Sequence, residues 1–118
     1  MTYVDGFVFA VKTADKEKFR EYGNRIDVLF KKHGAIQVIE AWGEDVPKGK
    51  ETDFYWAVQA KADETIVFSW IVWPDKAARE LGNEKVFAEV EAMGEDATRL
   101  PFDGKRMIYG GFDVLVDL

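Results

Sequence analysis

Residues 64–74 read ETIVFSWIVWP, and this stretch decides the fold. Successive side chains of a β-strand point to opposite faces of the sheet. Here both sets are apolar: one contains Ile66, Phe68, Trp70 and Val72, and the other contains Val67, Ile71 and Trp73. Pro74 ends the strand because proline has no backbone N–H to donate. The stretch therefore predicts a strand over about 64–73 that needs cover on both faces.

The N-terminal part of the chain predicts a strand, a helix and a second strand. Residues 3–12, YVDGFVFAVK, are rich in the β-branched and aromatic residues typical of strands. Apolar residues then recur at helical spacing over 14–33, with Thr13 as the expected cap and Gly34 as the expected left-handed last residue. The second strand is predicted over 35–43, AIQVIEAWG.

The C-terminal part contains one ambiguous segment and two clear elements. Residues 54–61, FYWAVQAK, fit either a short helix capped by Thr52 or Asp53, or a strand, and we favour the helical turn. The clear elements are a helix over about 76–92 that begins after Asp75 and ends near 93–94, and a final strand within 103–118 that runs to the terminus.

The predicted order β-α-β-β-α-β specifies an α+β, ferredoxin-like domain. Right-handed crossovers place both helices on one face of a four-stranded antiparallel sheet. Strands 3–12 and 64–73, the most apolar in the sequence, then occupy the centre. The 118 residues are expected to form a single domain over 1–118.

The second face of this sheet predicts a dimer. Strand 3–12 and the final strand are also apolar in both registers, and the two predicted helices are enough to cover only one face. A bare second face would expose more contiguous apolar surface than soluble monomers usually tolerate. Two copies stacked sheet to sheet about a twofold axis would cover it. We therefore expect a homodimer through the helix-free face.

Composition narrows the classes of partner and location. The formal charge is −6, whereas binding to nucleic acid requires a clustered positive surface. No apolar run approaches the ~18 residues that a membrane span needs, so no membrane partner is expected. The chain has no cysteine, which excludes disulfides and fits a reducing compartment. We expect a cytoplasmic protein, and nothing in the sequence calls for a cofactor or a metal.

Four segments resemble a known family: YVDGFV (3–8), ETIVFSWIV (64–72), PFDGKRMIYGGF (101–112) and LVDL (115–118). Over essentially the whole chain the sequence is similar to the bacterial YbaA-like family of unknown function, within the dimeric α/β barrel superfamily. The resemblance implies ferredoxin-like subunits that pair sheet to sheet. Other branches of that superfamily include cofactor-free monooxygenases, haem-degrading enzymes and small-ligand-binding regulators, and the fold alone does not choose among them.

Polar residues that interrupt apolar strands are the first candidate site. Asp5, Glu40, Ser69 and Asp113 each do so, and a buried carboxylate is costly unless it is paired. If these groups face the space between two sheets, they could hold a ligand or act as a base. In the alternative interpretation, Asp5 and Asp113 lie near strand ends, contact Arg106 or backbone amides and shape the interface.

Aromatic residues are the second candidate. Trp70 and Tyr109, with Trp42, Trp56 and Trp73, could line a pocket for a flat ligand, although core packing explains aromatic residues on strands equally well. His33 is the only histidine and is expected to pack at a helix end. The complete set of predicted ligand-binding residues is Asp5, Glu40, Ser69, Trp70, Arg106, Tyr109 and Asp113.

Two functions follow as hypotheses. The first is a homodimeric small-molecule-binding protein that acts as a cofactor-independent oxygenase or isomerase, in a pocket between sheet and helices. The alternative is a non-enzymatic regulatory or stress-related dimer. An apolar cavity that receives Asp5, Glu40 or Asp113 would favour the first.

Overall fold

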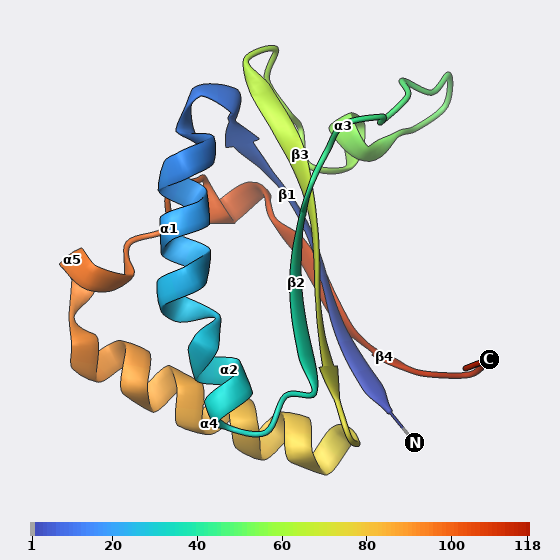
Figure 1. The fold of residues 1–118 in the computed structure, drawn as a ribbon. Helices are drawn as coiled ribbons and strands as arrows, with labels where there is room; N and C mark the ends of the chain where they lie inside the picture. The colour runs from blue at the N-terminus through green and yellow to red at the C-terminus, as the bar shows by residue number, and fades with distance from the viewer. Residues whose placement is uncertain (1) are drawn as a thin grey trace.

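The sheet has the predicted topology. The computed structural model describes residues 2–118, and its four strands lie in the order β2-β3-β1-β4 with antiparallel neighbours (Figure 1). The strands are β1 (Tyr3–Lys12), β2 (Gln37–Trp42), β3 (Glu64–Trp73) and β4 (Ile108–Asp113). The predicted α+β fold with a four-stranded antiparallel sheet is confirmed.

The two central strands hold the core together. β1 and β3 pair along their whole length, from Tyr3 opposite Trp73 to Lys12 opposite Glu64. Side chains on one face of this pair form the main core with α1 (Lys16–Ile26), where Phe9, Val11, Phe19 and Val67 are buried together. The apolar pattern of these strands, read from the sequence, is therefore confirmed as central.

The first predicted helix is divided into three parts. Residues Thr13–Asp15 form a short 3₁₀ turn, followed by α1 and then by α2 (Val28–Lys32). The prediction that Thr13 caps the helix is wrong, because its hydroxyl lies 2.6 Å from the Thr65 hydroxyl on β3 instead. Asp27 separates α1 from α2. Gly34 has a φ of +111° and follows the helix as predicted.

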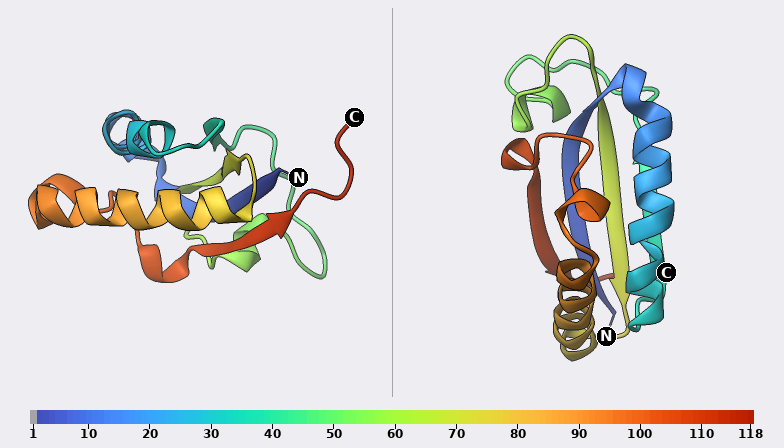
Figure 2. Two further views of the ribbon diagram at one scale, coloured as in Figure 1. Left: turned by 90° about the horizontal axis from the view of Figure 1, so that it is seen from below. Right: turned by 90° about the vertical axis from the view of Figure 1, so that its left-hand side faces the viewer.

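The second long helix, α4 (Lys76–Met93), projects away from the sheet. Asp75 caps it as predicted, accepting a hydrogen bond of 2.7 Å from the Ala78 N–H. α1 runs alongside the strands, whereas α4 crosses their direction and is seen almost end-on in the same view (Figure 2). The buried residues of α4 are Gly82 and Val86. Phe87, next to Val86 in the sequence, is 65% exposed.

Gly82 is the reason that α4 can approach the sheet at that point. A Cβ at Gly82 would lie 2.3 Å from the ring of Trp73 and 2.8 Å from the His33 carbonyl oxygen. Glycine therefore lets the helix backbone rest on the fully buried Trp73. Two short elements follow α4: α5 (Glu95–Thr98) and the 3₁₀ turn η2 (Gly104–Arg106).

The opposite face of the sheet is partly covered by the chain itself. The ambiguous segment forms α3 (Phe54–Ala57), capped by Asp53, so the predicted helical turn is confirmed. α3 lies on the side of the sheet away from α1 (Figure 1). Just after it, Val58 is buried together with Ala10 and Ile66. Our expectation that no segment of the chain covers this face is therefore wrong at this end.

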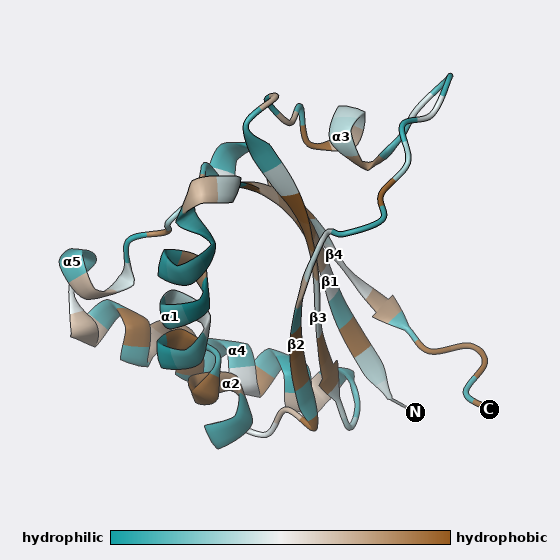
Figure 3. Cartoon of the chain, turned by 45° about the horizontal axis from the view of Figure 1, so that its top comes forward, coloured by the Kyte–Doolittle hydropathy of each residue, from teal (hydrophilic) through white to brown (hydrophobic). Residues whose placement is uncertain are grey.

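No helix covers the rest of that face (Figure 3). We call it the open face, and its apolar residues are Val4, Val8, Ile39, Phe68, Trp70, Val72, Ile108 and Phe112. Val8 also packs against the cluster of Ala10, Val58 and Ile66. Phe68 is 46% exposed and Phe112 is 60% exposed. The final strand ends at Asp113 rather than at the terminus, so that prediction is wrong. Residues 114–118 leave on the side of the open face (Figures 1 and 3).

No helix among residues 2–118 combines the length and the apolar composition that a membrane crossing needs.

Candidate functional site

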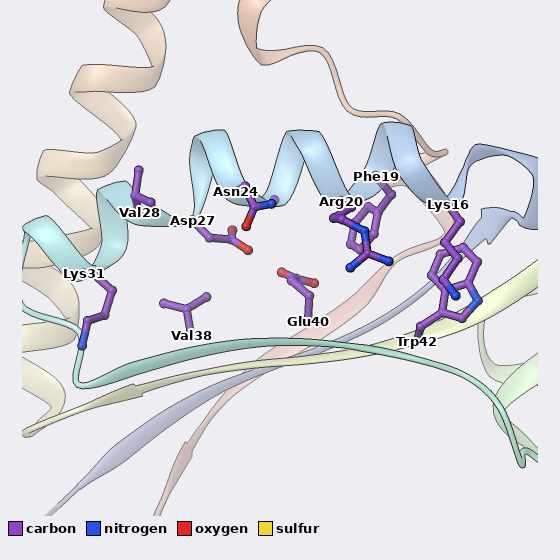
Figure 4. Close-up of a pocket in the computed structure, with 11 residues that line it drawn as sticks. Lys16, Phe19, Arg20, Asn24, Asp27, Val28, Lys31, Val38, Glu40 and Trp42 are labelled. Carbon is purple, nitrogen blue, oxygen red and sulfur yellow. The ribbon is translucent and has the colours of Figure 1, made fainter.

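A pocket of about 380 Å³ lies between α1 and β2, on the helix side of the sheet (Figure 4). Its lining residues come from one helical row and one strand face: Lys16, Phe19, Arg20, Gly23, Asn24, Asp27, Val28, Lys31, Val38, Glu40 and Trp42. A volume of this size is at the lower end of the range of small-molecule sites, roughly 300–1,000 Å³. The pocket is therefore large enough for one small ligand.

Two carboxyl groups face each other across the middle of the pocket. Glu40 projects from β2 and Asp27 projects from the junction of α1 and α2 (Figure 4). Glu40 lies opposite Ser69 of β3 in the sheet, and the Ser69 hydroxyl donates a 2.9 Å hydrogen bond to Glu40 Oε1. Because the hydroxyl fixes one oxygen of Glu40, the remaining carboxyl oxygen is directed to Asp27 and the pocket.

Gly23 leaves space beside this pair. A Cβ at Gly23 would lie 3.4 Å from Asp27 Oδ2 and 3.8 Å from Glu40 Cγ. The helix turn that faces the strand here is buried and has no side chain. A larger residue at this position would fill the space between the helix and the carboxyl groups.

The surroundings favour retention of one proton by the pair. Burial raises the pKa of Glu40 to about 8, and the negative charge of Asp27 adds to this effect. Burial also raises the pKa of Asp27 to about 6, against a smaller lowering by the neighbouring Glu40 carboxyl. The Glu40 side chain reaches solvent inside the pocket, but the protein around the pocket still disfavours its charge. Around neutral pH the two groups together therefore hold about one proton.

One end of the pocket combines aromatic and basic groups. The rings of Phe19 and Trp42 have centroids 6.3 Å apart and form an apolar wall. Lys16 Nζ lies 5.6 Å from the centroid of the Trp42 ring, and Arg20 is beside it (Figure 4). Lys31 lies at the opposite end, where it donates a 2.8 Å hydrogen bond to the Ile36 carbonyl.

Asp5 lies on the same face of the sheet as Glu40 but in a separate network. The Arg79 guanidinium donates to its carboxylate at 2.9 Å and 3.0 Å, and Trp73 Nε1 donates at 3.1 Å. Asn83 adds a donor at 3.4 Å. Asp5, Glu40 and Ser69 all point to the helices, so the condition that they face the space between two sheets is not met. The contact of Asp5 with Arg106 that the alternative interpretation named is not made, because α4 supplies Arg79 instead.

Arg106 fastens the 3₁₀ turn η2 to the start of β3. Its guanidinium donates two hydrogen bonds to Glu64, at 2.8 Å and 2.7 Å, and one of 3.0 Å to Asp103. Arg106 lowers the pKa of Glu64 to about 2. The charge of Arg106 is therefore paired with Glu64 and Asp103. Its contacts are structural, and it does not line the pocket.

The other predicted residues lie apart from the pocket. Trp70 is on the open face, with its ring centroid 5.6 Å from that of Phe68. Tyr109 is 74% exposed on β4, and Asp113 is exposed at the end of that strand. The structure does not bring them to Glu40, and a ligand role for them stays a prediction. His33 Nε2 lies 2.7 Å from Glu89, which agrees with packing at a helix end.

The sequence prediction missed the helical half of the site. Lys16, Arg20 and Asn24 recur every four residues, and Asp27 and Lys31 continue the row. These positions form one line on a helix surface. Glu40 could have pointed to these helical residues, because a polar side chain on the mainly apolar strand β2 needs a polar partner from the facing helix.

A second pocket, of about 360 Å³, lies near α3 and offers fewer reactive side chains to a ligand. Its two acidic side chains already have partners: Asp53 caps α3, and Glu64 pairs with Arg106. Among residues 2–118 there is no group of three or more His, Asp or Glu side chains that could hold a metal ion.

The fold and this pocket describe a small α+β protein with a pair of carboxyl groups between helix and sheet. Residues 2–104 match the family described as "Protein of unknown function (DUF1428)", and the chain belongs to that family. It is 48% identical over 117 residues to "Uncharacterized protein YbaA" of Escherichia coli K12, covering 99% of each chain. The same values hold for the protein of that name from Shigella flexneri. The predicted YbaA-like resemblance is thereby confirmed.

Among solved structures, a protein called "De novo designed protein Foldit4" aligns with 98% of both chains, at 16% identity and a TM-score of 0.43. At this level the similarity carries no information on function.

Proposed function

We propose that the protein binds a small carbonyl compound in the pocket between α1 and β2 and moves a proton on it. The observation that carries this proposal is the Asp27–Glu40 pair, two carboxyl groups that face each other across the pocket. Their surroundings raise the pKa of both groups, which favours a shared proton. Such a pair offers an ionised carboxylate and a carboxylic acid in the same site. These are the two groups that acid–base catalysis at neutral pH requires.

The proposed reaction is an isomerisation through an enol. The ionised carboxylate removes a proton from the carbon next to the carbonyl, which breaks a C–H bond. The protonated carboxyl gives its proton to the carbonyl oxygen, and the C–H electron pair becomes the new C=C bond. A proton then returns from the first carboxyl to carbon while the enol O–H gives its proton back to the second carboxylate, which re-forms a carbonyl and restores both groups with no net oxidation. The pair thus supports the isomerase form of the first hypothesis without an oxidant.

Deuterium exchange tests the proposed proton transfer. Phenylpyruvate and its methyl ester serve as probes, because each combines a flat ring with a C–H next to a carbonyl. We expect the protein to accelerate exchange at that carbon, and Glu40→Gln to slow it by about 100-fold. Glu84→Gln, at an exposed position of α4, is the matched control. Exchange that is not accelerated with either probe, or that Glu40→Gln leaves unchanged, would overturn the proposal.

Carbon-13 NMR titration of the side-chain carboxyls tests the pair directly. We expect Asp27→Asn to lower the pKa of Glu40, because the like charge is lost. That pKa should stay above the ordinary 4.5, because burial is the larger cause. Two wild-type carboxyls that titrate independently near their ordinary values would contradict a shared proton.

We also propose that the open face is covered by a second copy of the chain. Four strands of six to ten residues span roughly 20 Å by 20–30 Å, or about 400–600 Å² in plan. The adjoining α3 and the C-terminal tail extend this area towards the ~800 Å² per partner of a stable interface. The tail supports the idea, because residues 114–118 leave on that side of the sheet (Figure 1) and Leu115 within them is 90% exposed.

Sedimentation equilibrium tests this dimer. Phe68→Lys and Phe112→Lys place a charge on the open face, and we expect each to shift the protein to monomer. Leu81→Lys is the control, because Leu81 is equally apolar and 55% exposed but lies on α4. A wild-type protein that is monomeric at micromolar concentration would refute the proposal.

A non-enzymatic regulatory dimer is the second candidate, and the exposed open face is the observation that favours it. It would replace the first if the dimer forms and the carboxyl pair titrates normally. A cytoplasmic location remains part of both proposals and is supported by the absence of cysteine from the sequence.

A further inference from the structure

We propose that the substrate of this pocket is a small organic acid, a carboxylate that also carries the reacting carbonyl, and that Arg20 and Lys16 bind its carboxylate. This inference rests on the proposed function, because it names the class of ligand for the same site. It is carried by the charge, the position and the pairing of the basic residues in the lining.

The pocket has the opposite charge to the whole molecule. The chain carries a formal charge of −6, yet the lining contains three basic residues, Lys16, Arg20 and Lys31, against two acidic ones. The lining is therefore positive by one charge even when Asp27 and Glu40 are both ionised. A positive pocket in an acidic protein attracts anions locally while the remaining surface repels them.

The basic groups at the aromatic end are available to a ligand. Within the described residues 2–118, Arg20 is paired only with Glu17 of the same helix, at 2.9 Å, and both side chains are largely exposed. An exposed pair of this kind is weak, so an anionic ligand can compete for the guanidinium. Lys16 has no carboxylate within ion-pair distance among residues 2–118, and its Nζ lies over the Trp42 ring. Lys31, by contrast, already donates to a backbone carbonyl.

The order of groups along the pocket matches an acid with a neighbouring carbonyl. Arg20, Lys16 and Trp42 lie at one end, and the carboxyl pair lies in the middle (Figure 4). A planar guanidinium can bind both oxygens of a carboxylate. A ligand anchored there would extend its carbonyl towards Glu40 and Asp27, with Phe19 and Trp42 against its apolar part. The pocket volume of about 380 Å³ admits one such molecule.

Isothermal titration calorimetry with the same two probes separates this inference from the proposed function. We expect phenylpyruvate to bind about 10- to 100-fold more tightly than its uncharged methyl ester. Arg20→Met combined with Lys16→Met should remove that preference and leave binding of the ester unchanged. Lys18→Met is the matched control, since Lys18 is on the same helix, exposed, and outside the lining.

The outcomes are distinct. If phenylpyruvate fails to bind, or binds no more tightly than the ester, the anionic substrate class is overturned. If the preference persists in the double variant, the assignment to Arg20 and Lys16 is overturned. Either result leaves proton transfer to be judged by deuterium exchange. Lack of exchange with a retained preference for the acid would instead refute the proposed reaction while supporting the ligand class. A phosphonate analogue that binds more tightly than phenylpyruvate would overturn the choice of a carboxylate.

Discussion

Asp5 and Glu40 are carboxylates on the same face of one sheet, yet the helices above them give them opposite partners. α4 brings Arg79 to Asp5, with two further donors from Trp73 and Asn83. The α1–α2 junction brings a second carboxyl, Asp27, to Glu40. The positions of Asp5 and Glu40 on their strands do not distinguish the two residues. What distinguishes them is the facing helix residue, which is Arg79 for Asp5 and Asp27 for Glu40.

The difference separates a structural group from a reactive one. A buried carboxylate that accepts from a guanidinium and further donors ties two elements together. A carboxyl beside another carboxyl keeps a proton that it can exchange. The pair at Asp5 links β1 to α4, whereas the pair at Glu40 lies beside an open volume.

The largest effect is expected when the charge partner of Asp5 is removed. Arg79→Met leaves a buried carboxylate without its cation and should lower the free energy of unfolding by about 3–5 kcal/mol, measured by urea denaturation. The double variant Asp5→Asn/Arg79→Met should recover much of that loss, because no charge is left buried. Equal losses in the single and double variants would contradict the structural role assigned to this pair.

An intermediate effect is expected at Glu40, and it depends on pH. The folded-state pKa of Glu40 is raised to about 8 from an ordinary 4.5, so its protonation favours the folded state. That contribution is complete below about pH 4.5 and is lost as the pH rises through 8. Glu40→Gln should therefore become more stable relative to wild type from pH 5 to pH 9, measured by thermal unfolding. Parallel curves for the two proteins would remove the basis for a shared proton.

The smallest effect on stability is expected at Arg20. Its ion pair with Glu17 is exposed, so Arg20→Met should change the free energy of unfolding by no more than about 0.5 kcal/mol. The contrast with Arg79→Met sharpens the comparison, because one arginine supports the fold and the other is assigned to the ligand. If Arg20→Met lowered the free energy of unfolding as much as Arg79→Met, Arg20 would support the fold rather than bind the ligand.

The strands were predictable because their pattern is local. A run of β-branched and aromatic residues and the position of Pro74 set the bounds of β3, and the apolar character of 3–12 placed β1 beside it. The direction of α4 was not predictable in the same way. It follows from the close approach of Gly82 to Trp73, a contact between residues of two different elements. No pattern within the helix indicates that contact.

The strand half of the candidate site was predictable, because it too follows from a local sequence pattern. Glu40 was selected because a carboxylate is unusual within an apolar strand, and the structure places it in the pocket. Asp27 was missed because a polar residue on an amphipathic helix usually faces solvent. Neither glycine nor proline marks the break at Asp27, so the sequence gives no warning that the helix changes there.

The four tryptophans are placed so that each lies in a different environment. Trp73 is fully buried beneath α4, Trp42 lines the pocket, Trp70 belongs to the open face and Trp56 is 67% exposed near α3. Indole fluorescence shifts to longer wavelength as water reaches the ring. Variants that keep one indole and replace the other three by phenylalanine would therefore give four optical probes, which report separately on unfolding, ligand entry, subunit association and the mobility of α3.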